Sequence, residues 1–415
     1  MLWQPSLPEQ YHRRSPAELA ALIAARREQL GRRLVILGHH YQTDEVIQHA
    51  DVTGDSLKLS QTAADLAQSR SAVDPVSWVV FCGVHFMAET ADMLTPDGVC
   101  VILPDLSAGC SMADMAQYDD CVQAWESIHG SLRGQGWTGR IVPITYVNSS
   151  AAVKAFVGAH GGACCTSSNA KAVFDWAMRG GTLPRQPGED IKVIFLPDQH
   201  LGRNTAAAAG MDVARQTVLY DPRRARNGEA LAGIEPESLR EASVVLWAGH
   251  CSVHKLFRPE HCDQVRAQDA TEATHTKILV HPECSKEVVD RADLSGSTEF
   301  IIRTIDDAAP GTRWAIGTEV HLVARLAKRA AHRGVHVRIL SDCQCLCTTM
   351  FRIDQPHLLW VLDNLAGALS KSGSPKVVNE IRVHPEVRRD ALLAIERMLA
   401  HTGGKVVAAA KAAVD

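Results

Sequence analysis

Side chains that can titrate or bind metal ions stand directly after short apolar runs of the sequence. His39 and Tyr41 follow "LVILG", and His281 and Glu283 follow "KILV". Such runs predict buried strands of parallel sheets, which bind ligands at the carboxyl ends of their strands. Polar loops alone would explain serine and aspartate at these ends, but they explain histidine, cysteine and tyrosine less well. Further groups at such ends are Cys110, Tyr146, Asn148, Ser167, Cys251 and His254.

Three cysteines crowd the stretch "SDCQCLCTTM", residues 341–350. Cys343, Cys345 and Cys347 alternate with other residues, and alternate side chains of an extended strand lie about 7 Å apart. Metal–sulfur bonds at a tetrahedral ion are only about 2.3 Å long, so the three thiols are not expected to share one ion. An iron–sulfur cluster is larger and could take one thiolate from this loop and others from distant strand ends. Cysteines packed beside a turn are the alternative.

The composition is that of a globular protein. The chain has 415 residues and a net charge of −4, with 46% apolar and 22% charged residues. We expect two or three domains and neither nucleic-acid nor membrane partners. Prolines and charges interrupt the N-terminal segment, and no apolar run is long enough for a bilayer, so we expect a cytoplasmic protein. Twelve cysteines in a reducing compartment then favour metal ligands or reactive thiols over disulfides.

Strand-like runs alternate with helix-like segments along the chain. The runs extend from "RLVILG" to "VRILS", and segments such as "AELAALIAARREQL" and "EVHLVARLAKRAAH" lie between them. This alternation predicts an α/β fold with parallel sheets, and breaks near 120 and 249 indicate about three similar units. The sequence contains no glycine-rich dinucleotide fingerprint, P-loop or "HExxH", which excludes the simplest nucleotide and zinc-hydrolase interpretations.

The strand-end motifs together resemble those of quinolinate synthase, the iron–sulfur enzyme of de novo NAD biosynthesis. They occur in the family's order and cover most of residues 33–352. Each motif is weak by itself, whereas the ordered set is highly specific. The motifs are "ILGHHYQTDEV", "ADVTGDSLKLS", "GVHFMAETADML", "CSMADM", "TYVNSSAAVKA", "CTSSNA", "WAGHCSVH", "VHPECSKEVVDRADLSGST", "GTEVHLV" and "CTTM".

The resemblance implies three pseudo-symmetric, three-layer α/β domains with parallel sheets around a central iron–sulfur site. A [4Fe–4S] cluster would be held by one cysteine from each domain, and the implied ligands are Cys110, Cys251 and Cys347. Cys347 is preferred to its neighbours because the family's ligand directly precedes the segment that resembles "TTM". The expected domains are residues 1–120, with 346–415 returning to them, then 121–249 and 250–345.

The resemblance also implies the reaction, a condensation of iminoaspartate with dihydroxyacetone phosphate to quinolinate, phosphate and water. An iron with an open position would act as a Lewis acid. The implied catalytic residues are His39, Tyr41 as an acid/base group and Glu283 as a second base. A transient association with L-aspartate oxidase is also expected, because the imine is unstable. The implied substrate-binding residues are His39, Tyr41, Ser56, Tyr146, Asn148, Ser167, His254, His281, Glu283, Ser297 and Thr298.

Several alternatives stay open at this point. The serines and Thr298 stand where helices should begin, so each alone would be interpreted as a plain helix cap. Cys343 and Cys345 are either packing residues or a redox-sensitive pair with Cys347. A different three-cysteine iron–sulfur enzyme, of the diphosphate reductase type, has cysteine contexts that "CSMADM" and "CTTM" do not match. A non-catalytic iron–sulfur redox sensor would need a partner or nucleic-acid surface, which the charge does not indicate.

Overall fold

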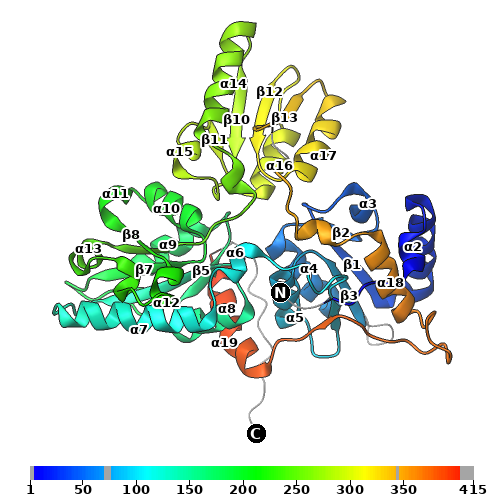
Figure 1. Cartoon of the computed structure of the whole chain (residues 1–415), viewed down its shortest axis with the longest axis horizontal. Helices are drawn as coiled ribbons and strands as arrows, with labels where there is room; N and C mark the ends of the chain where they lie inside the picture. The colour runs from blue at the N-terminus through cyan, green and yellow to red at the C-terminus, as the bar shows by residue number, and fades with distance from the viewer. Residues whose placement is uncertain (1–3, 70–75, 343–344, 402–415) are drawn as a thin grey trace. The chain divides into compact units, whose positions relative to one another are not determined.

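The computed structural model describes residues 4–69, 76–342 and 345–401. Within them the chain is an α/β protein with three mostly parallel sheets, so the predicted fold class is confirmed. Each apolar run predicted as a strand contains one. The chain divides into two compact units, the first running to Met115 and including His250–His384, the second comprising Ala116–Gly249 and the segment that starts at Pro385. Figure 1 labels the elements of both units.

One sheet of the first unit combines the four N-terminal strands with β14, which comes from much later in the sequence. Its order is β14-β4-β3-β1-β2, and only β14 runs antiparallel to its neighbour. Every residue of β1 and β3 is buried, as expected for a parallel sheet covered on both faces. The strands are β1 (Leu34–His39), β2 (Val52–Gly54), β3 (Trp78–Cys82), β4 (Cys100–Ile102) and β14 (Glu380–Ile381).

The other sheet of the first unit is parallel throughout, with the order β11-β10-β12-β13. Val280 at the end of β10 pairs with Gly317 at the end of β12. The ladder continues one step further, because the His281 N–H donates to the Gly317 carbonyl at 3.1 Å. His281 and Thr318 therefore leave the sheet side by side. The strands are β10 (Thr276–Val280), β11 (Leu294–Ser295), β12 (Arg313–Gly317) and β13 (His336–Ile339).

Helices cover these two sheets, and local sequence signals set their ends. Helix α2 begins at a capping box in which Ser15 and Glu18 each accept a hydrogen bond from the other's backbone N–H. It packs along α18, as Figure 1 shows at the right. The long helices are α2 (Pro16–Leu30), α4 (Ser56–Ser69), α5 (His85–Leu94), α14 (Pro259–Glu272), α16 (Thr298–Asp306), α17 (Val320–Ala331) and α18 (Gln355–Leu365). Shorter turns are α1 (Glu9–His12), α3 (Asp44–Ile47), α6 (Ser111–Asp114), α15 (Lys286–Val289), η1 (Gly31–Arg33), η3 (His254–Leu256) and η4 (Met350–Arg352).

The second unit holds the remaining sheet, with the parallel order β6-β5-β7-β9-β8. Its strands are β5 (Arg140–Tyr146), β6 (Ala163–Cys165), β7 (Ile191–Leu196), β8 (Thr217–Tyr220) and β9 (Val244–Trp247). Its helices are α7 (Tyr118–Gly134), α8 (Ala151–Ala159), α9 (Ala170–Met178), α10 (Gln199–Ala208), α11 (Val213–Gln216), α12 (Pro222–Arg226), η2 (Ala230–Gly233), α13 (Pro236–Glu241) and α19 (Pro385–Leu399).

Helix α19 lies elsewhere than the sequence-based division of the chain predicted. We expected residues 346–415 to return to the first domain, but α19 packs along α8 and β6 in the second unit. The Arg397 guanidinium donates to the carbonyls of Gly158 and Gly162 at 2.9 and 2.6 Å. A Cβ on Gly158 would lie 1.9 Å from the Asp390 carbonyl oxygen, so this close helix contact requires glycine. The predicted boundaries near 120, 249 and 345 stay a prediction.

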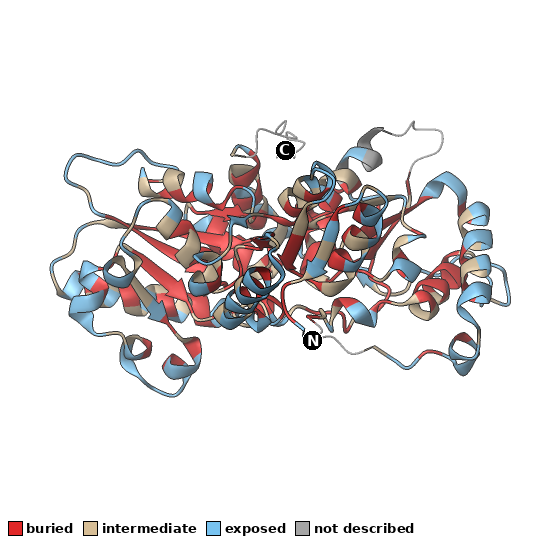
Figure 2. Cartoon of the chain, turned by 90° about the horizontal axis from the view of Figure 1, so that it is seen from above, coloured by how far each residue is buried: buried red, intermediate tan, exposed pale blue. Residues whose placement is uncertain are grey.

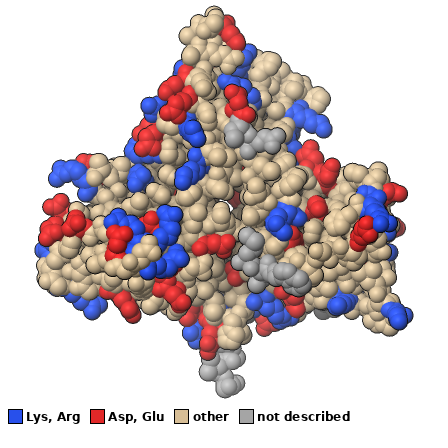
Figure 3. Space-filling model, viewed as in Figure 1, with Lys and Arg blue, Asp and Glu red and all other residues tan. Residues whose placement is uncertain are grey.

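The burial pattern follows the sheets. Figure 2 shows buried residues concentrated on the strands, with exposed residues on the outer faces of helices. On the face drawn in Figure 3, basic and acidic side chains are interspersed. No helix within residues 4–69, 76–342 or 345–401 is long and apolar enough to cross a membrane.

Candidate active site and thiol centre

Three cysteines of the first unit each precede a short helical turn. Cys110 is the N-cap of α6 and Cys251 precedes η3, where the Lys255 N–H donates to its carbonyl at 3.1 Å. Cys347 precedes η4, where the Phe351 N–H donates to its carbonyl at 3.0 Å. Burial raises the pKa of each thiol, and backbone N–H groups at the start of each turn offset part of that rise. Each sulfur therefore meets donors that favour its thiolate form.

Packing and electrostatic effects link these three thiols. Burial is the main cause that raises the pKa of each, to about 12 for Cys110. The charge of Cys347 raises the pKa of both Cys110 and Cys251 further. Cys347 packs against two apolar cores, one shared with Cys110 and the other with Cys251. Half-buried thiols whose negative charges disfavour one another form an arrangement typical of metal ligands, since a bound metal supplies the missing positive charge.

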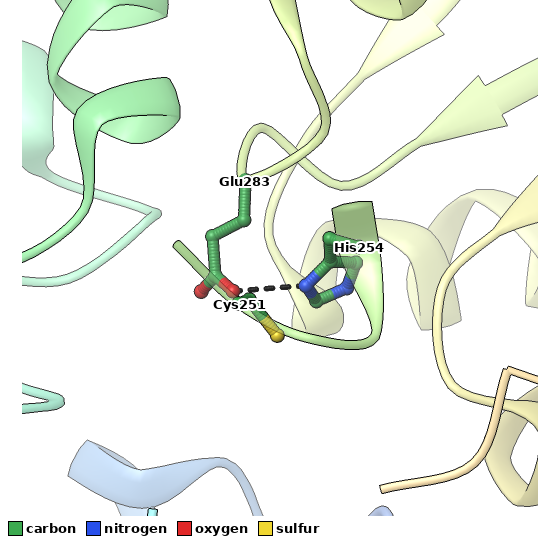
Figure 4. A group of neighbouring side chains, drawn as sticks. All are labelled: Cys251, His254 and Glu283. Carbon is green, nitrogen blue, oxygen red and sulfur yellow. Dashed lines mark hydrogen bonds and ion pairs between the residues drawn. The ribbon is translucent and has the colours of Figure 1, made fainter. Parts of the chain in front are cut away.

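A histidine and a glutamate stand beside one of these thiols. Figure 4 shows Cys251, His254 and Glu283 converging, with ligand atoms within 4.8 Å of one another. The His254 Nδ1 lies 2.8 Å from a Glu283 carboxylate oxygen, and both side chains are buried. The His254 ring also stacks on His281 with centroids 4.4 Å apart.

Tyr41, which follows a strand of the N-terminal sheet, is linked to His254 by hydrogen bonds. The Tyr41 phenol oxygen lies 3.1 Å from Thr318 Oγ1 and 3.3 Å from Thr298 Oγ1. Thr318 Oγ1 in turn lies 3.1 Å from His254 Nε2. Burial raises the pKa of Tyr41 well above its usual value, and the Glu283 charge raises it further. Tyr41 is therefore a protonated hydroxyl at neutral pH.

Two further histidines are neutral hydrogen-bond donors. Burial lowers the pKa of His281 to about 3, with a contribution from His254, and lowers that of His39 well below its usual range. The Tyr41 N–H donates to His39 Nδ1 at 3.1 Å, and the Glu283 N–H donates to His281 Nδ1 at 3.3 Å. Each neutral ring must then carry its proton on Nε2. Both rings can donate to an oxygen atom without bringing a positive charge.

Buried hydroxyl groups mark the beginnings of two helices in this unit. Ser56 is the first residue of α4, and Ser297 is the N-cap of α16, where its Oγ accepts from the Phe300 N–H at 3.3 Å. Thr298 begins α16 and its Oγ1 contacts Tyr41. The capping role considered for Ser297 is thus observed. Helix N-termini also favour anions, so capping does not exclude binding.

Comparison with known proteins identifies the chain's family. The sequence pattern of a family described as quinolinate synthetase A protein matches residues 21–400. The chain belongs to this family. It is 48% identical to a quinolinate synthase of Acidobacterium capsulatum, across 91% of each chain. It is 49% identical to one of Nocardioides sp., across 94% of this chain and 91% of the relative, and 47% identical to one of Bacillus velezensis, across 95% and 96%.

The remaining predicted residues of this quinolinate synthetase A family member lie in its second unit. Tyr146 ends β5 and pairs with Cys165 at the end of β6, so the loops that follow these strands start side by side. The Val147 N–H extends the pairing by donating to the Cys165 carbonyl at 2.8 Å. Asn148 Oδ1 is buried and has no hydrogen-bond partner among the described residues, and Ser167 is half-buried. An unsatisfied buried acceptor is a position for a ligand's donor.

The other cysteines of this family member differ in setting from the three at helical turns. Cys345 is fully buried, and its sulfur lies 3.5 Å from Ser341 Oγ. Cys284 contacts the Gly317 carbonyl at 3.8 Å, and Cys164 is buried in the strand β6. Cys343 lies outside the described residues, so its predicted role is untested.

Sequence reasoning missed three residues that this arrangement uses. Thr318 bridges Tyr41 and His254. It directly follows the apolar run "RWAIG", so it could have been found as a polar residue at the carboxyl end of a strand. Arg325 donates to the carbonyls of His40 and Gln42, on either side of Tyr41. Glu299 lies 3.1 Å from His40 Nε2. Arg325 belongs to α17 and Glu299 to α16. No local sequence pattern marks such long-range contacts.

Proposed function

We propose that this chain is a quinolinate synthase that condenses iminoaspartate with dihydroxyacetone phosphate, giving quinolinate, phosphate and two water molecules. A [4Fe–4S] cluster held by Cys110, Cys251 and Cys347 is part of the proposal. The observation that carries it is the setting of these thiols, each half-buried at a helical turn with backbone donors. Family membership over residues 21–400 supports the same activity.

The donor set fits an iron–sulfur cluster better than a single zinc ion. The sulfurs come from three separate turns, and the sequence contains no two pairs of cysteines with the spacing of a four-cysteine zinc site. Backbone N–H groups directed at cysteine sulfur are a known feature of such cluster sites. When bound, a cluster with three protein ligands supplies an iron with an open position that acts as a Lewis acid.

The chain's own residues provide a path for a proton between Tyr41 and Glu283. A Glu283 carboxylate accepts from His254 Nδ1–H, so His254 Nε2 accepts from the Thr318 hydroxyl, which in turn accepts from Tyr41. The phenol can thus take a proton from the substrate while its own proton passes along these hydrogen bonds to the Glu283 carboxylate, and the reverse transfer gives a proton back to a substrate oxygen. Glu283 is the group at the end of this path that takes up or supplies the proton. These contacts support the acid/base roles that we propose for Tyr41 and Glu283.

Substrate oxygens require donors, and the first unit offers two kinds. His39 and His281 are neutral Nε2–H donors, suited to carboxylate or carbonyl oxygens. Ser56, Ser297 and Thr298 stand at the starts of α4 and α16, where backbone N–H groups and the helix dipole favour phosphate. We include Tyr146, Asn148 and Ser167 of the second unit as substrate-binding residues, because Asn148 Oδ1 is buried with no partner among the described residues.

The chemistry of the substrate favours a supplying partner. Imines hydrolyse in water, so iminoaspartate should reach the enzyme soon after an aspartate oxidase forms it. We include this transient association in the proposal on that ground alone, and we also propose the cytoplasmic location expected from the sequence.

The test is an assay of quinolinate from anaerobically reconstituted protein. Oxaloacetate and ammonium ions supply iminoaspartate, dihydroxyacetone phosphate is added, and quinolinate is measured by chromatography. Wild type should form quinolinate and Cys251→Ser should not. Cys100→Ser is the matched control, since this half-buried cysteine lies in β4, and it should behave as wild type. An iron-loaded wild-type chain that forms no quinolinate would refute the proposal.

A further inference from the structure

A buried aspartate in the loop before Cys110 contacts an arginine in the turn after Cys347, and both belong to the first unit. Asp105 lies in the loop between β4 and Cys110, and its carboxylate oxygen Oδ2 accepts from Arg352 Nε at 3.2 Å. Ser107 completes the contact, because its Oγ accepts from the same Arg352 Nε at 2.6 Å and lies 2.5 Å from Asp105 Oδ1. The Ser107 N–H donates to that oxygen at 2.8 Å.

The negative charge of the Asp105 carboxylate would be costly to leave without a cation. The Asp105 side chain is only 2% exposed, whereas that of Arg352 is 47% exposed. His357 Nε2 is the next basic atom, at 3.9 Å from Asp105, and its Nδ1 is held by Asp354 at 2.7 Å. Loss of the Arg352 guanidinium would leave a buried carboxylate without its direct cation, and the loop would have to rearrange.

Each end of the contact is tied to a cysteine by a tight turn. On one side, the Ala108 N–H donates to the Asp105 carbonyl at 3.0 Å and the Gly109 N–H donates to the Ser107 carbonyl at 2.8 Å. Cys110 follows directly. On the other side, Arg352 closes η4, and the Phe351 N–H in this turn donates to the Cys347 carbonyl. The side-chain contact thus joins the backbone that carries Cys110 to the backbone that carries Cys347.

We propose that Asp105, Ser107 and Arg352 are positioning residues that hold the turns of Cys110 and Cys347 at a fixed separation, so that both thiolates bind the same cluster. This inference rests on the proposed function, since it takes the two cysteines as ligands. Contacts outside the ligands that orient them typically change metal affinity by about 10- to 100-fold when removed. The contact of Arg352 with Asp105 and Ser107 therefore controls how firmly iron is retained.

The experiment compares iron loss from full-length protein after anaerobic reconstitution. Excess chelator is added and release of iron is followed by absorbance, for wild type, Arg352→Gln, Arg352→Lys and Ser107→Ala. Arg382→Gln is the matched control, because Arg382 Nε donates to Glu380 at 2.8 Å in the same unit without joining the two cysteine turns. Thermal unfolding of each iron-free variant measures any general loss of stability.

Arg352→Gln should lose iron about 10-fold or more faster than wild type, with Ser107→Ala between them. Arg352→Lys, which keeps a cation, should restore part of the retention, and Arg382→Gln should match wild type. If Arg352→Gln released iron at the rate of Arg382→Gln, the positioning role would be overturned while the proposed function stood. A wild type that takes up no iron would overturn both.

Discussion

The phenol oxygen of Tyr41 lies 3.1 Å from the hydroxyl oxygen of Thr318, although 277 positions separate the two residues in the sequence. Tyr41 follows β1 of one sheet and Thr318 follows β12 of the other sheet in the first unit. Both belong to the carboxyl ends of parallel strands, where such sheets bind ligands. Through Thr318, Tyr41 is linked to His254 and then to Glu283.

Replacing Tyr41 with phenylalanine removes the hydroxyl at the start of this series of hydrogen bonds and keeps the ring. Turnover should fall by about 100- to 10,000-fold, the usual contribution of a general acid or base, while iron content stays that of wild type. Steady-state kinetics and iron analysis on the same preparation measure the two quantities. A variant that kept wild-type turnover would show that Tyr41 moves no proton in the reaction.

Two neighbouring cysteines should respond differently to substitution. Cys347→Ser removes a thiolate at a helical turn, so iron bound per chain after reconstitution should fall sharply. Cys345→Ala empties a small volume in an apolar core, so it should cost about 1–2 kcal/mol of stability and leave iron binding intact. Iron analysis and urea unfolding separate the outcomes. The reverse pattern would assign the ligand to Cys345.

Arg325 should matter for catalysis without touching the reacting atoms. Its guanidinium holds the carbonyls of His40 and Gln42, so Arg325→Gln should release the turn that carries Tyr41. A small displacement of a catalytic group can be costly, and we expect kcat/KM to fall about 10- to 100-fold. Arg329→Gln is the control, since Arg329 lies on the same helix as Arg325 and pairs instead with Asp306 of α16. Equal kinetics for the two variants would contradict this role.

The hydrogen bond from Tyr11 to Asp363, at 2.8 Å, should make stability depend on pH in alkali. Burial and the Asp363 carboxylate raise the pKa of Tyr11 above its ordinary value. The fold therefore favours the protonated phenol. Its contribution is complete below about pH 10, where the unfolded chain also keeps the proton, and it is lost as the pH rises further toward the folded-state pKa.

Tyr11→Phe should accordingly be less stable than wild type by about 1.5–3 kcal/mol near neutral pH, because a hydrogen bond to a charged acceptor is lost. The difference should shrink as the pH rises above about 10. Urea unfolding at pH 8 and pH 11 gives both free energies. A difference that grew with pH would mean that the phenol is not stabilised in its protonated form.

A fully buried lysine in the second unit should affect substrate binding. The Lys154 ammonium donates to the Ser149 carbonyl, and Ser149 Oγ donates to the Tyr146 carbonyl at 2.9 Å. Lys154→Met should loosen the loop of Tyr146 and Asn148 and raise KM more than it lowers kcat. Lys171→Met, which removes an exposed pair with Asp175, is the control. An unchanged KM would show that this loop takes no part in substrate binding.

Much of the fold was predictable because the buried strands are short and apolar. The run "RLVILG" forms β1 and "TKILV" forms β10. Each is followed directly by the polar residues that were expected at the carboxyl ends of the strands. Strands such as β2 and β11, with partly exposed residues and few apolar side chains, carry no such signal. The placement of α19 in the second unit was missed because its amphipathic sequence shows that a face is buried but not against which partner.

The site was predictable where a residue directly follows a strand, as His281 does, or belongs to a family motif, as Cys347 does. Arg352 and Arg325 could not be found in this way. Each acts through a long side chain on the backbone or carboxylate of a loop far away in the sequence, and only the folded structure brings these groups together.

The central claim is that Cys110, Cys251 and Cys347 hold an iron–sulfur cluster. The most direct test measures iron and acid-labile sulfide per chain after anaerobic reconstitution, with the same measurement on Cys110→Ser and Cys100→Ser. We predict about four iron ions and four sulfides per chain for wild type and Cys100→Ser, and a marked loss of both for Cys110→Ser. Zinc alone in the wild type, or no bound metal, would contradict the claim.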